Sequence, residues 1–272
     1  DLYGVFYSLD EATWQPSTFA SGTVYSLNTR KSSVMFAGST VGVFYSANQG
    51  NTWSKSNNGM NAVSINALDV DVAGTIFLAT EHQGLYRSTD KGDSWQDGNN
   101  TLPNGSFRAI IIAQSGTIFV GHEYMGVYRS TDFGLNWTRS DSGLNGTTVK
   151  HLASHNGNVY AATLEAGLST SEDDGINWRQ INPPVGNFNI TALGLNPSGD
   201  IFACYEGYGV FYSSGNGSSW QFRGTELAPF DVQAFGFDST GKVYAATGSP
   251  DGLFSSDNNG LMWNPTGFTK TV

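Results

Sequence analysis

The sequence predicts an all-β fold assembled from repeated four-stranded units, and three observations support this prediction. A motif that ends in tryptophan recurs seven times and accounts for all 7 tryptophans among the 272 residues. Successive tryptophans lie 39, 42, 42, 41, 42 and 43 residues apart, and helical periodicity is absent between them. A period near 42 with four strand signals in each unit is typical of the blades of a β-propeller.

The clearest copies of the motif follow the pattern Ser-x-Asp-x-Gly-x-x-Trp. Two further copies have asparagine at the aspartate position, one has Gly215 there, and the first copy is one residue short. The acidic or amide positions and the tryptophans are Asp10, Asn48, Asp90, Asp132, Asp173 and Asn258, with Trp14, Trp53, Trp95, Trp137, Trp178, Trp220 and Trp263.

Each position of the motif has an expected structural role in a tight turn. The aspartate is expected to accept hydrogen bonds from backbone N–H groups two or three residues later, and asparagine offers a similar acceptor. The glycine is expected to have a positive φ. The tryptophan is expected to begin the outer strand and to bury its ring between blades, with the indole N–H near the polar turn.

The unit that ends near Trp95 shows the expected strands in order. Residues 65–70 form the first strand, 75–80 the second and 84–88 the third, and the short fourth strand is 94–96. The second strand contains small and apolar residues throughout, as expected where both faces are covered. Its equivalents are residues 34–38, 117–121, 158–163, 200–204 and 242–247.

The N-terminal unit is expected to be incomplete. Residues 4–8 and 13–15 supply only third and fourth strands. We expect one propeller domain over residues 1–272 with seven blades, the first of them partial; a six-bladed propeller with an appended hairpin is the alternative. Because the sequence begins at Asp1 without a signal-like segment, we expect a processed form or part of a larger chain.

Composition excludes several classes of function. The net charge of −10 and the pI near 4.6 disfavour nucleic-acid binding. No apolar run approaches the roughly 18 to 20 residues that span a bilayer, so membrane insertion is not expected. The single cysteine, Cys204, lies in a predicted strand and is expected to be buried. The four histidines lack ligand spacing and the glycines fall in turns, so neither a metal nor a cofactor is expected.

The repeated motif resembles the Asp box, or BNR repeat, and the chain resembles the Asp-box β-propellers over residues 1–263. These families include sialidases, xyloglucan-degrading glycoside hydrolases, the sortilin luminal domain and photosystem assembly factors. The resemblance implies that the boxes are structural and lie away from the face that holds the sialidase active site. The arginine triad of sialidases is missing here, so the chain is expected to be a non-sialidase member.

The loops between second and third strands carry the candidate binding site. Five of them contain a carboxylate, with aromatic and histidine side chains nearby. A site for a sugar, a peptide or a cation is one interpretation, a set of solvated turns is another, and a catalytic carboxylate pair is a third. The candidate residues are Glu81, His82, Glu123, Tyr124, Glu165, Glu206, Tyr208 and Asp251.

We therefore expect a non-catalytic recognition or scaffold propeller that is secreted, on the cell surface or periplasmic. Its partner is expected to be a glycan or a protein. The alternative is a glycoside hydrolase or lyase that uses two of the loop carboxylates, one of which would need a raised pKa. Blades of nearly equal length leave no long insertion that could build a substrate cleft, which argues against the enzyme.

Overall fold

A computed structural model describes residues 5–8, 10, 13–19, 22–28, 34–61, 64–186, 188–227, 231–248 and 252–268. The chain divides into two compact units. The first contains residues 1–9 and 14–140, and the second contains residues 10–13 and 141–272.

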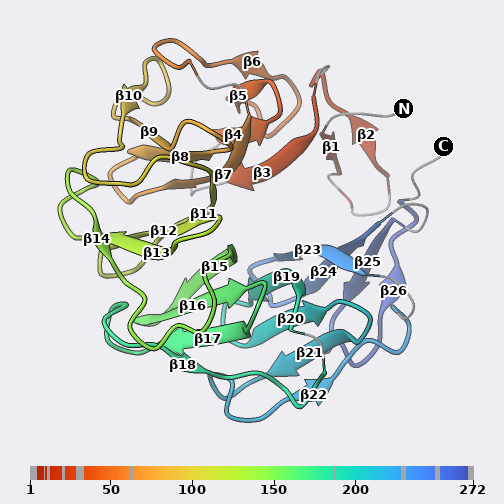
Figure 1. Ribbon diagram of the computed structural model, residues 1–272. Helices are drawn as coiled ribbons and strands as arrows, with labels where there is room; N and C mark the ends of the chain where they lie inside the picture. The colour runs from red at the N-terminus through yellow and green to blue at the C-terminus, as the bar shows by residue number, and fades with distance from the viewer. Residues whose placement is uncertain are drawn as a thin grey trace. The chain divides into compact units, whose positions relative to one another are not determined.

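The first unit contains a hairpin and three four-stranded blades (Figure 1). The hairpin pairs β1 (Phe6–Tyr7) with β2 (Gln15–Pro16). Blade 1 has β3 (Val24–Asn28), β4 (Met35–Ser39), β5 (Gly42–Ser46) and β6 (Ser54–Lys55). Blade 2 has β7 (Ile65–Val70), β8 (Ile76–Thr80), β9 (Leu85–Ser88) and β10 (Gln96–Asp97). Blade 3 has β11 (Phe107–Ile112), β12 (Ile118–His122), β13 (Gly126–Ser130) and β14 (Thr138–Arg139).

The second unit contains three more blades of the same design. Blade 4 has β15 (Val149–His155), β16 (Asn158–Thr163), β17 (Gly167–Ser171) and β18 (Arg179–Gln180). Blade 5 has β19 (Ile190–Leu195), β20 (Ile201–Tyr205), β21 (Gly209–Ser213) and β22 (Gln221–Phe222). Blade 6 has β23 (Val232–Phe237), β24 (Val243–Thr247), β25 (Leu253–Ser256) and β26 (Asn264–Pro265).

Every blade is an antiparallel sheet whose strands are paired in chain order, which confirms the all-β propeller fold. Within the described residues six complete blades are present, the smaller of the two numbers left open by the sequence. The register of the hairpin, with Tyr7 opposite Gln15, matches that of Tyr45 opposite Ser54 in blade 1. The N-terminal box therefore belongs to the third and fourth strands of a partial unit, as expected.

The hydrophobic core lies between successive blades of each unit. Second strands such as β8 and β20 are buried along their length, whereas β24 is partly exposed. One core cluster joins Phe36 and Val43 of blade 1 to Ile65, Leu78 and Trp95 of blade 2. The alternation of the strands explains this arrangement, because each second strand sends apolar side chains toward both neighbouring blades.

The box turns are built from side-chain hydrogen bonds, and their geometry corrects one expectation. Ser88 donates to Asp90 over 2.7 Å and accepts from the Gly92 N–H over 2.8 Å. The Asp90 carboxylate accepts from the N–H of Ser94, four residues later, whereas two or three residues were expected. In the short first box, Asp10 accepts from Thr13, three residues later. Asn48 and Asn258 accept the same bonds as the aspartates, at 2.9 and 3.0 Å.

Two consecutive residues in each full-length box adopt positive φ. Lys91 has φ of 61° and Gly92 has φ of 89°, and Phe133 and Gly134 repeat the pair at 59° and 76°. Glycine tolerates this backbone without penalty, whereas the bulky Phe133 is strained by it. The strain is confined to the exposed tip of the box.

The box tryptophans bind the preceding blade rather than their own turn. Trp95 donates its indole N–H to the carbonyl of Ser56, which directly follows the fourth strand of blade 1. Equivalent bonds join Trp137 to Gly98, Trp220 to Ile181 and Trp263 to Arg223, over 3.1, 2.6 and 2.6 Å. Trp53 differs from these four tryptophans, because its indole N–H donates to the carbonyl of Gly50 in its own turn. The fourth strands also begin just after the tryptophan and not with it.

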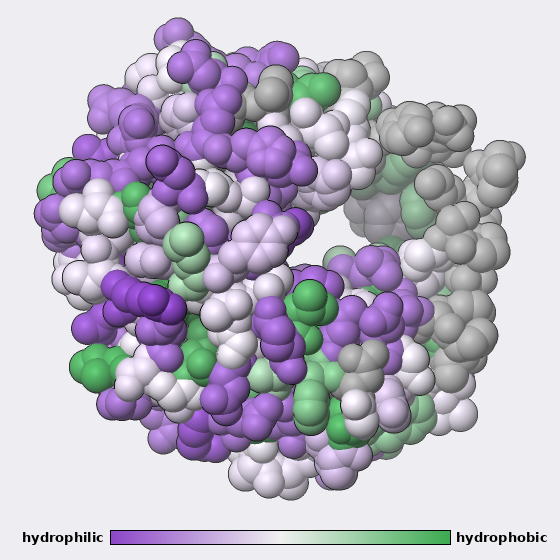
Figure 2. Space-filling model, viewed as in Figure 1, coloured by the Kyte–Doolittle hydropathy of each residue, from purple (hydrophilic) through white to green (hydrophobic). Residues whose placement is uncertain are grey.

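The viewed surface of the first unit is mainly hydrophilic, with isolated hydrophobic residues (Figure 2).

Cys204 is buried, as expected, and burial raises the pKa of its thiol. Within the described residues, no helix has the length and hydropathy needed to cross a membrane.

Candidate functional site

The candidate site lies at one end of each blade, which we call the loop end; the box end is the opposite one. In each blade the loop end holds the connection from the second to the third strand. One backbone bond fixes this loop: Glu81 N–H donates to Ser64, Glu123 N–H to Ser106, and Glu206 N–H to Asn189, over 2.9 to 3.1 Å. The loop residues are therefore held in equivalent places by the same main-chain contact.

The loop acids are less equivalent than the sequence suggests. Glu81, Glu123 and Glu206 occupy one repeat position. In blade 4 the equivalent N–H belongs to Leu164, so Glu165 lies one residue further along. Asp251 lies outside the described residues.

A second feature of the loop end is a β-bulge in every first strand, which the sequence analysis missed. The register of each first strand skips one residue shortly after it begins, so that this residue has no opposite partner on the second strand. Bulges redirect side chains at sheet ends. The bulge residues are Tyr25, Asn66, Arg108, Lys150, Thr191 and Gln233.

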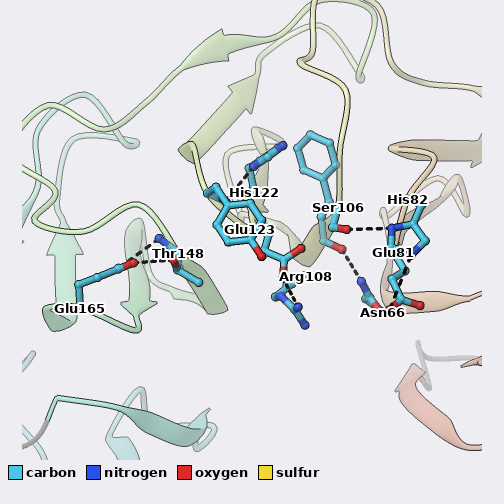
Figure 3. A network of polar contacts seen from close by, with 11 residues as sticks. Asn66, Glu81, His82, Ser106, Arg108, His122, Glu123, Thr148 and Glu165 are labelled. Carbon is cyan, nitrogen blue, oxygen red and sulfur yellow. Dashed lines mark hydrogen bonds and ion pairs between the residues drawn. The ribbon is translucent and has the colours of Figure 1, made fainter.

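In blade 3 the bulge residue meets the loop acid (Figure 3). The guanidinium of Arg108 donates to the Glu123 carboxylate and forms an ion pair with it. The Arg108 side chain is 43% exposed and that of Glu123 is 16% exposed. The bond from Arg108 lowers the pKa of Glu123, outweighing the effect of burial, and Tyr124 also bonds to this carboxylate. The same bond from Tyr124 raises the pKa of its phenol.

His122, at the end of β12, is buried and has a structural role. Its exposure is 3%, and its ring packs edge-on against Phe107 at 4.9 Å. Its Nδ1 accepts from the Tyr124 N–H over 3.0 Å, and its Nε2 lies 3.3 Å from the carbonyl oxygen of Asn104. Phe107 is fully buried.

His82 and Glu81 are exposed at the loop end of blade 2. The His82 side chain is 80% exposed, and its Nε2 lies 4.0 Å from Glu81. Its Nδ1 lies 3.5 Å from the hydroxyl of Ser106. Nearby, Asn66 donates to the carbonyl of Phe107 over 3.0 Å (Figure 3).

In the second unit, Glu165 is held by its own blade. Its carboxylate accepts from the N–H groups of Thr147 and Thr148, both over 3.2 Å, and from the Thr148 hydroxyl. Burial alone would raise its pKa, but the bonds from Thr148 and Thr147 outweigh burial and lower it. The carboxylate therefore stays ionised and holds the segment that leads into β15.

A second polar chain in this unit links blades 4 and 5. Lys150 donates to the Asn189 amide oxygen over 2.9 Å, and the Asn189 amide nitrogen donates to Glu206 over 2.7 Å. Tyr208 lies two residues after Glu206 and is 45% exposed. Glu206 is thus connected to Lys150 through the side-chain amide of Asn189.

The loop ends also expose apolar surface next to these acids. Tyr124 and Met125 are 66% and 43% exposed in blade 3, and Leu164 is 42% exposed in blade 4. Exposed aromatic side chains beside polar groups are typical of recognition surfaces. The described residues contain no group of three His, Cys, Asp or Glu side chains placed to hold a metal ion.

The blades and their box turns define this protein as an Asp-box, or BNR-type, β-propeller. A family model described as "Photosynthesis system II assembly factor YCF48" matches residues 35–272, and the chain belongs to this family. No curated protein matches the sequence.

Solved structures resemble the chain in fold. The extracellular domain of B. thetaiotaomicron BT4673 has a TM-score of 0.74 and 17% identity over 90% of this chain and 33% of that one. The GH74 xyloglucanase of Xanthomonas campestris has a TM-score of 0.73 and 18% identity over 96% and 49%. A structure described as YCF48 bound to D1 peptide has a TM-score of 0.58 and 19% identity over 74% and 67%. The chain thus spans about a third of the length of the BT4673 domain and about half of the length of the xyloglucanase.

Proposed function

We propose that this chain is a non-catalytic recognition module whose loop ends bind a segment of a partner protein. The observation that carries the proposal is the state of the loop acids. Glu123 and Glu165 are held by hydrogen bonds that lower their pKa, and the ring of Tyr124, which follows Glu123 in the chain, is exposed.

This arrangement does not suit the enzymatic alternative. Glycoside hydrolysis requires a carboxylic acid that stays protonated near neutral pH, which means a raised pKa. Glu123 and Glu165 change in the opposite direction. The loops are also short, with only three residues between β12 and β13 and between β20 and β21.

A peptide ligand agrees better with the relatives than a glycan does. The YCF48 structure is described as bound to a D1 peptide, and that protein shares the fold of this chain. Some of the other similar structures are extracellular domains, which favours a secreted, cell-surface or periplasmic location for this chain as well.

Binding to arrays tests the proposal. The chain is applied in parallel to an array of overlapping peptides and to a glycan array, and glycan turnover is assayed. We compare Tyr124→Ala with Phe133→Ala, because the two aromatic residues are 66% and 69% exposed at opposite ends of β13.

We expect peptide binding that weakens about tenfold or more in Tyr124→Ala and little in Phe133→Ala, since one aromatic anchor contributes on the order of 1.4 kcal/mol or more. Equal weakening in both variants would place the binding surface elsewhere. Binding to glycans alone, or their cleavage, would contradict the proposal.

A further inference from the structure

The box of blade 5 keeps the turn of the other boxes but lacks their acceptor side chain. Gly215 stands at the position that aspartate or asparagine occupies in the other boxes. Asn216 and Gly217 still adopt positive φ, at 50° and 81°, as the equivalent pair does in blade 2. The Gly217 N–H still donates to the Ser213 hydroxyl oxygen, over 3.1 Å. The turn is therefore formed without a carboxylate.

In the complete boxes, three donors hold the carboxylate. Asp90 accepts from the Ser88 hydroxyl over 2.7 Å, and from the N–H and hydroxyl of Ser94 over 2.9 and 2.5 Å. Asp132 and Asp173 accept from the equivalent groups, with an asparagine amide in place of the second hydroxyl. These bonds lower the pKa of all three aspartates to about 2, although Asp90 and Asp173 are exposed. The donors of a box thus stabilise a carboxylate strongly, even in contact with water.

Blade 5 retains the same three donors but offers them no acceptor. They are the hydroxyl of Ser213 and the N–H and hydroxyl of Ser219, which align with the groups of Ser88 and Ser94. Among the described residues, the hydroxyl oxygen of Ser213 accepts from two N–H groups, but none of the three donors has an acceptor. Ser213 is 1% exposed. Because a buried donor without an acceptor is unfavourable, this hydroxyl favours an acceptor that enters from solution.

One movable side chain lies at the place of the missing carboxylate. A Cβ added to Gly215 would meet only Ser218, whose hydroxyl oxygen would be 2.5 Å away. Ser218 is exposed, and its hydroxyl makes no hydrogen bond to the described residues. A rotation of this side chain therefore admits a small group beside Gly215.

From these contacts we infer that the box of blade 5 binds a small carboxylate from solution, which Ser213 and Ser219 hold as the complete boxes hold their aspartates. The ligand class is a free monocarboxylate the size of acetate, because acetate has the same atoms as the aspartate side chain beyond Cα. Hydrogen bonds to an ionised acceptor are stronger than those between neutral groups. The site lies at the box end of the blade, so it is independent of the proposed function of the loop ends.

The affinity is expected to be modest. Acetate has few non-hydrogen atoms and loses its translational freedom on binding, so we expect a Kd on the order of 10 mM. The negative charge of the second unit also disfavours an anion. A carboxylate present at millimolar concentration would therefore occupy the site only in part.

Nuclear magnetic resonance of the isotope-labelled chain tests the inference at pH 7. Sodium acetate is compared with sodium chloride at equal ionic strength, and acetamide is the uncharged analogue. The Ser219 amide reports on blade 5, and the Asn177 amide, at the same position in the complete box of blade 4, is the internal control. The variants are Gly215→Asp, which supplies the carboxylate from the chain, and Asp173→Gly, which removes it from blade 4.

We expect a saturable shift of the Ser219 amide resonance with acetate and no shift at Asn177. Acetamide should bind at least tenfold more weakly. Gly215 does not adopt the left-handed backbone, so aspartate is tolerated there. In Gly215→Asp the Ser219 resonance should therefore no longer respond to acetate, whereas Asp173→Gly should transfer a response to Asn177. Unchanged amide resonances of the remaining boxes verify that each variant is folded.

Three results would overturn the inference. Equal shifts with chloride and acetate would show a general effect of salt. A Ser219 response that persists in Gly215→Asp would place the anion elsewhere, and no saturable response up to about 200 mM acetate would exclude the site. If Gly215→Asp does not fold, Asp173→Gly decides the question, since an Asn177 amide that ignores acetate would show that these donors do not capture a free carboxylate.

Discussion

At the scale of single residues, the titratable groups of this propeller act mainly as hydrogen-bond acceptors and buried neutral groups. Asp90, Asp132 and Asp173 each have a pKa of about 2, with hydrogen bonds from their own boxes as the largest causes. His151 shows the opposite situation, since burial lowers its pKa to about 4 and Lys150 adds to this effect. Both kinds of group make stability depend on pH.

For His151 we predict a loss of stability as the pH falls from about 6.5 to 4. The unfolded chain binds a proton at the ordinary histidine pKa of 6.5, and the folded chain resists it until about 4. Integrated over this window, the loss approaches about 3 kcal/mol. Urea unfolding at several pH values measures it. His151→Gln should flatten the pH dependence; equal slopes in the unaltered chain and this variant would contradict the assignment.

For the box aspartates we predict a separate loss at lower pH. Their depressed pKa stabilises the folded state above the unfolded value of 3.8, and this contribution disappears as the pH falls toward about 2. The double variant Asp132→Asn, Asp173→Asn retains the acceptor, as Asn48 and Asn258 do in their boxes. Acid titration followed by tryptophan fluorescence should therefore show a shallower transition between pH 4 and 2. A transition of unchanged steepness would show that other carboxylates control acid unfolding.

At the scale of elements, four of the box tryptophans, Trp95, Trp137, Trp220 and Trp263, bind the end of the outer strand of the blade before them. Trp95 holds the residue after β6, and Trp137 holds the residue after β10. These are bonds between different blades of one unit. In these four copies the tryptophan supplies both a large apolar ring and the hydrogen-bond donor.

We predict that Trp95→Phe lowers the free energy of unfolding by about 2 kcal/mol, since it leaves a buried carbonyl without its donor. Hydrogen exchange should locate the effect. In Trp95→Phe the amide of Ser56, which bonds to Val43, should exchange faster. In Trp137→Phe the amide of Gly98, which bonds to Leu85, should do so instead. The same exchange pattern in both variants would mean that the tryptophans act only through general packing.

The sequence predicted the strands more completely than it predicted the candidate site. The strand at residues 65–70 was located to the residue because its alternation and its position in the repeat agree. The fourth strands and the destination of the indole N–H were misplaced, because a repeat pattern does not say which blade a side chain contacts. The acids Glu81, Glu123 and Glu206 were correctly grouped by repeat position. The bulge that exposes Arg108 was missed, since a skipped residue in the register leaves no mark in the alternation of a short strand.

At the scale of the whole molecule, charge is distributed unevenly between the two units. The second unit contains 14 of the 23 acidic residues but only 5 of the 13 Lys and Arg residues. The first unit is close to neutral. Like charges within one compact unit repel one another and reduce its stability.

We predict that the melting temperature rises by a few degrees, roughly 2 to 5 °C, when NaCl is raised from 20 to 300 mM at pH 7. Salt at the higher concentration screens charges more than about 6 Å apart. The same titration at pH 4.6, near the pI, is the control, and the rise should largely vanish there. A fall in melting temperature at pH 7 would show that attractive pairs, such as Arg179 with Glu172, outweigh the repulsion.

The direction of the tryptophan bonds has a consequence for how the protein is made. The carbonyl of Ser56 belongs to one blade, and the indole that binds it is encoded 39 residues further on. Because a ribosome synthesises the chain from the N-terminus, the carbonyl of Ser56 leaves the ribosome 39 residues before the indole that binds it. Blades 1, 2, 4 and 5 are each bound by the tryptophan of the following blade, so each of them is completed only after the next repeat has been synthesised.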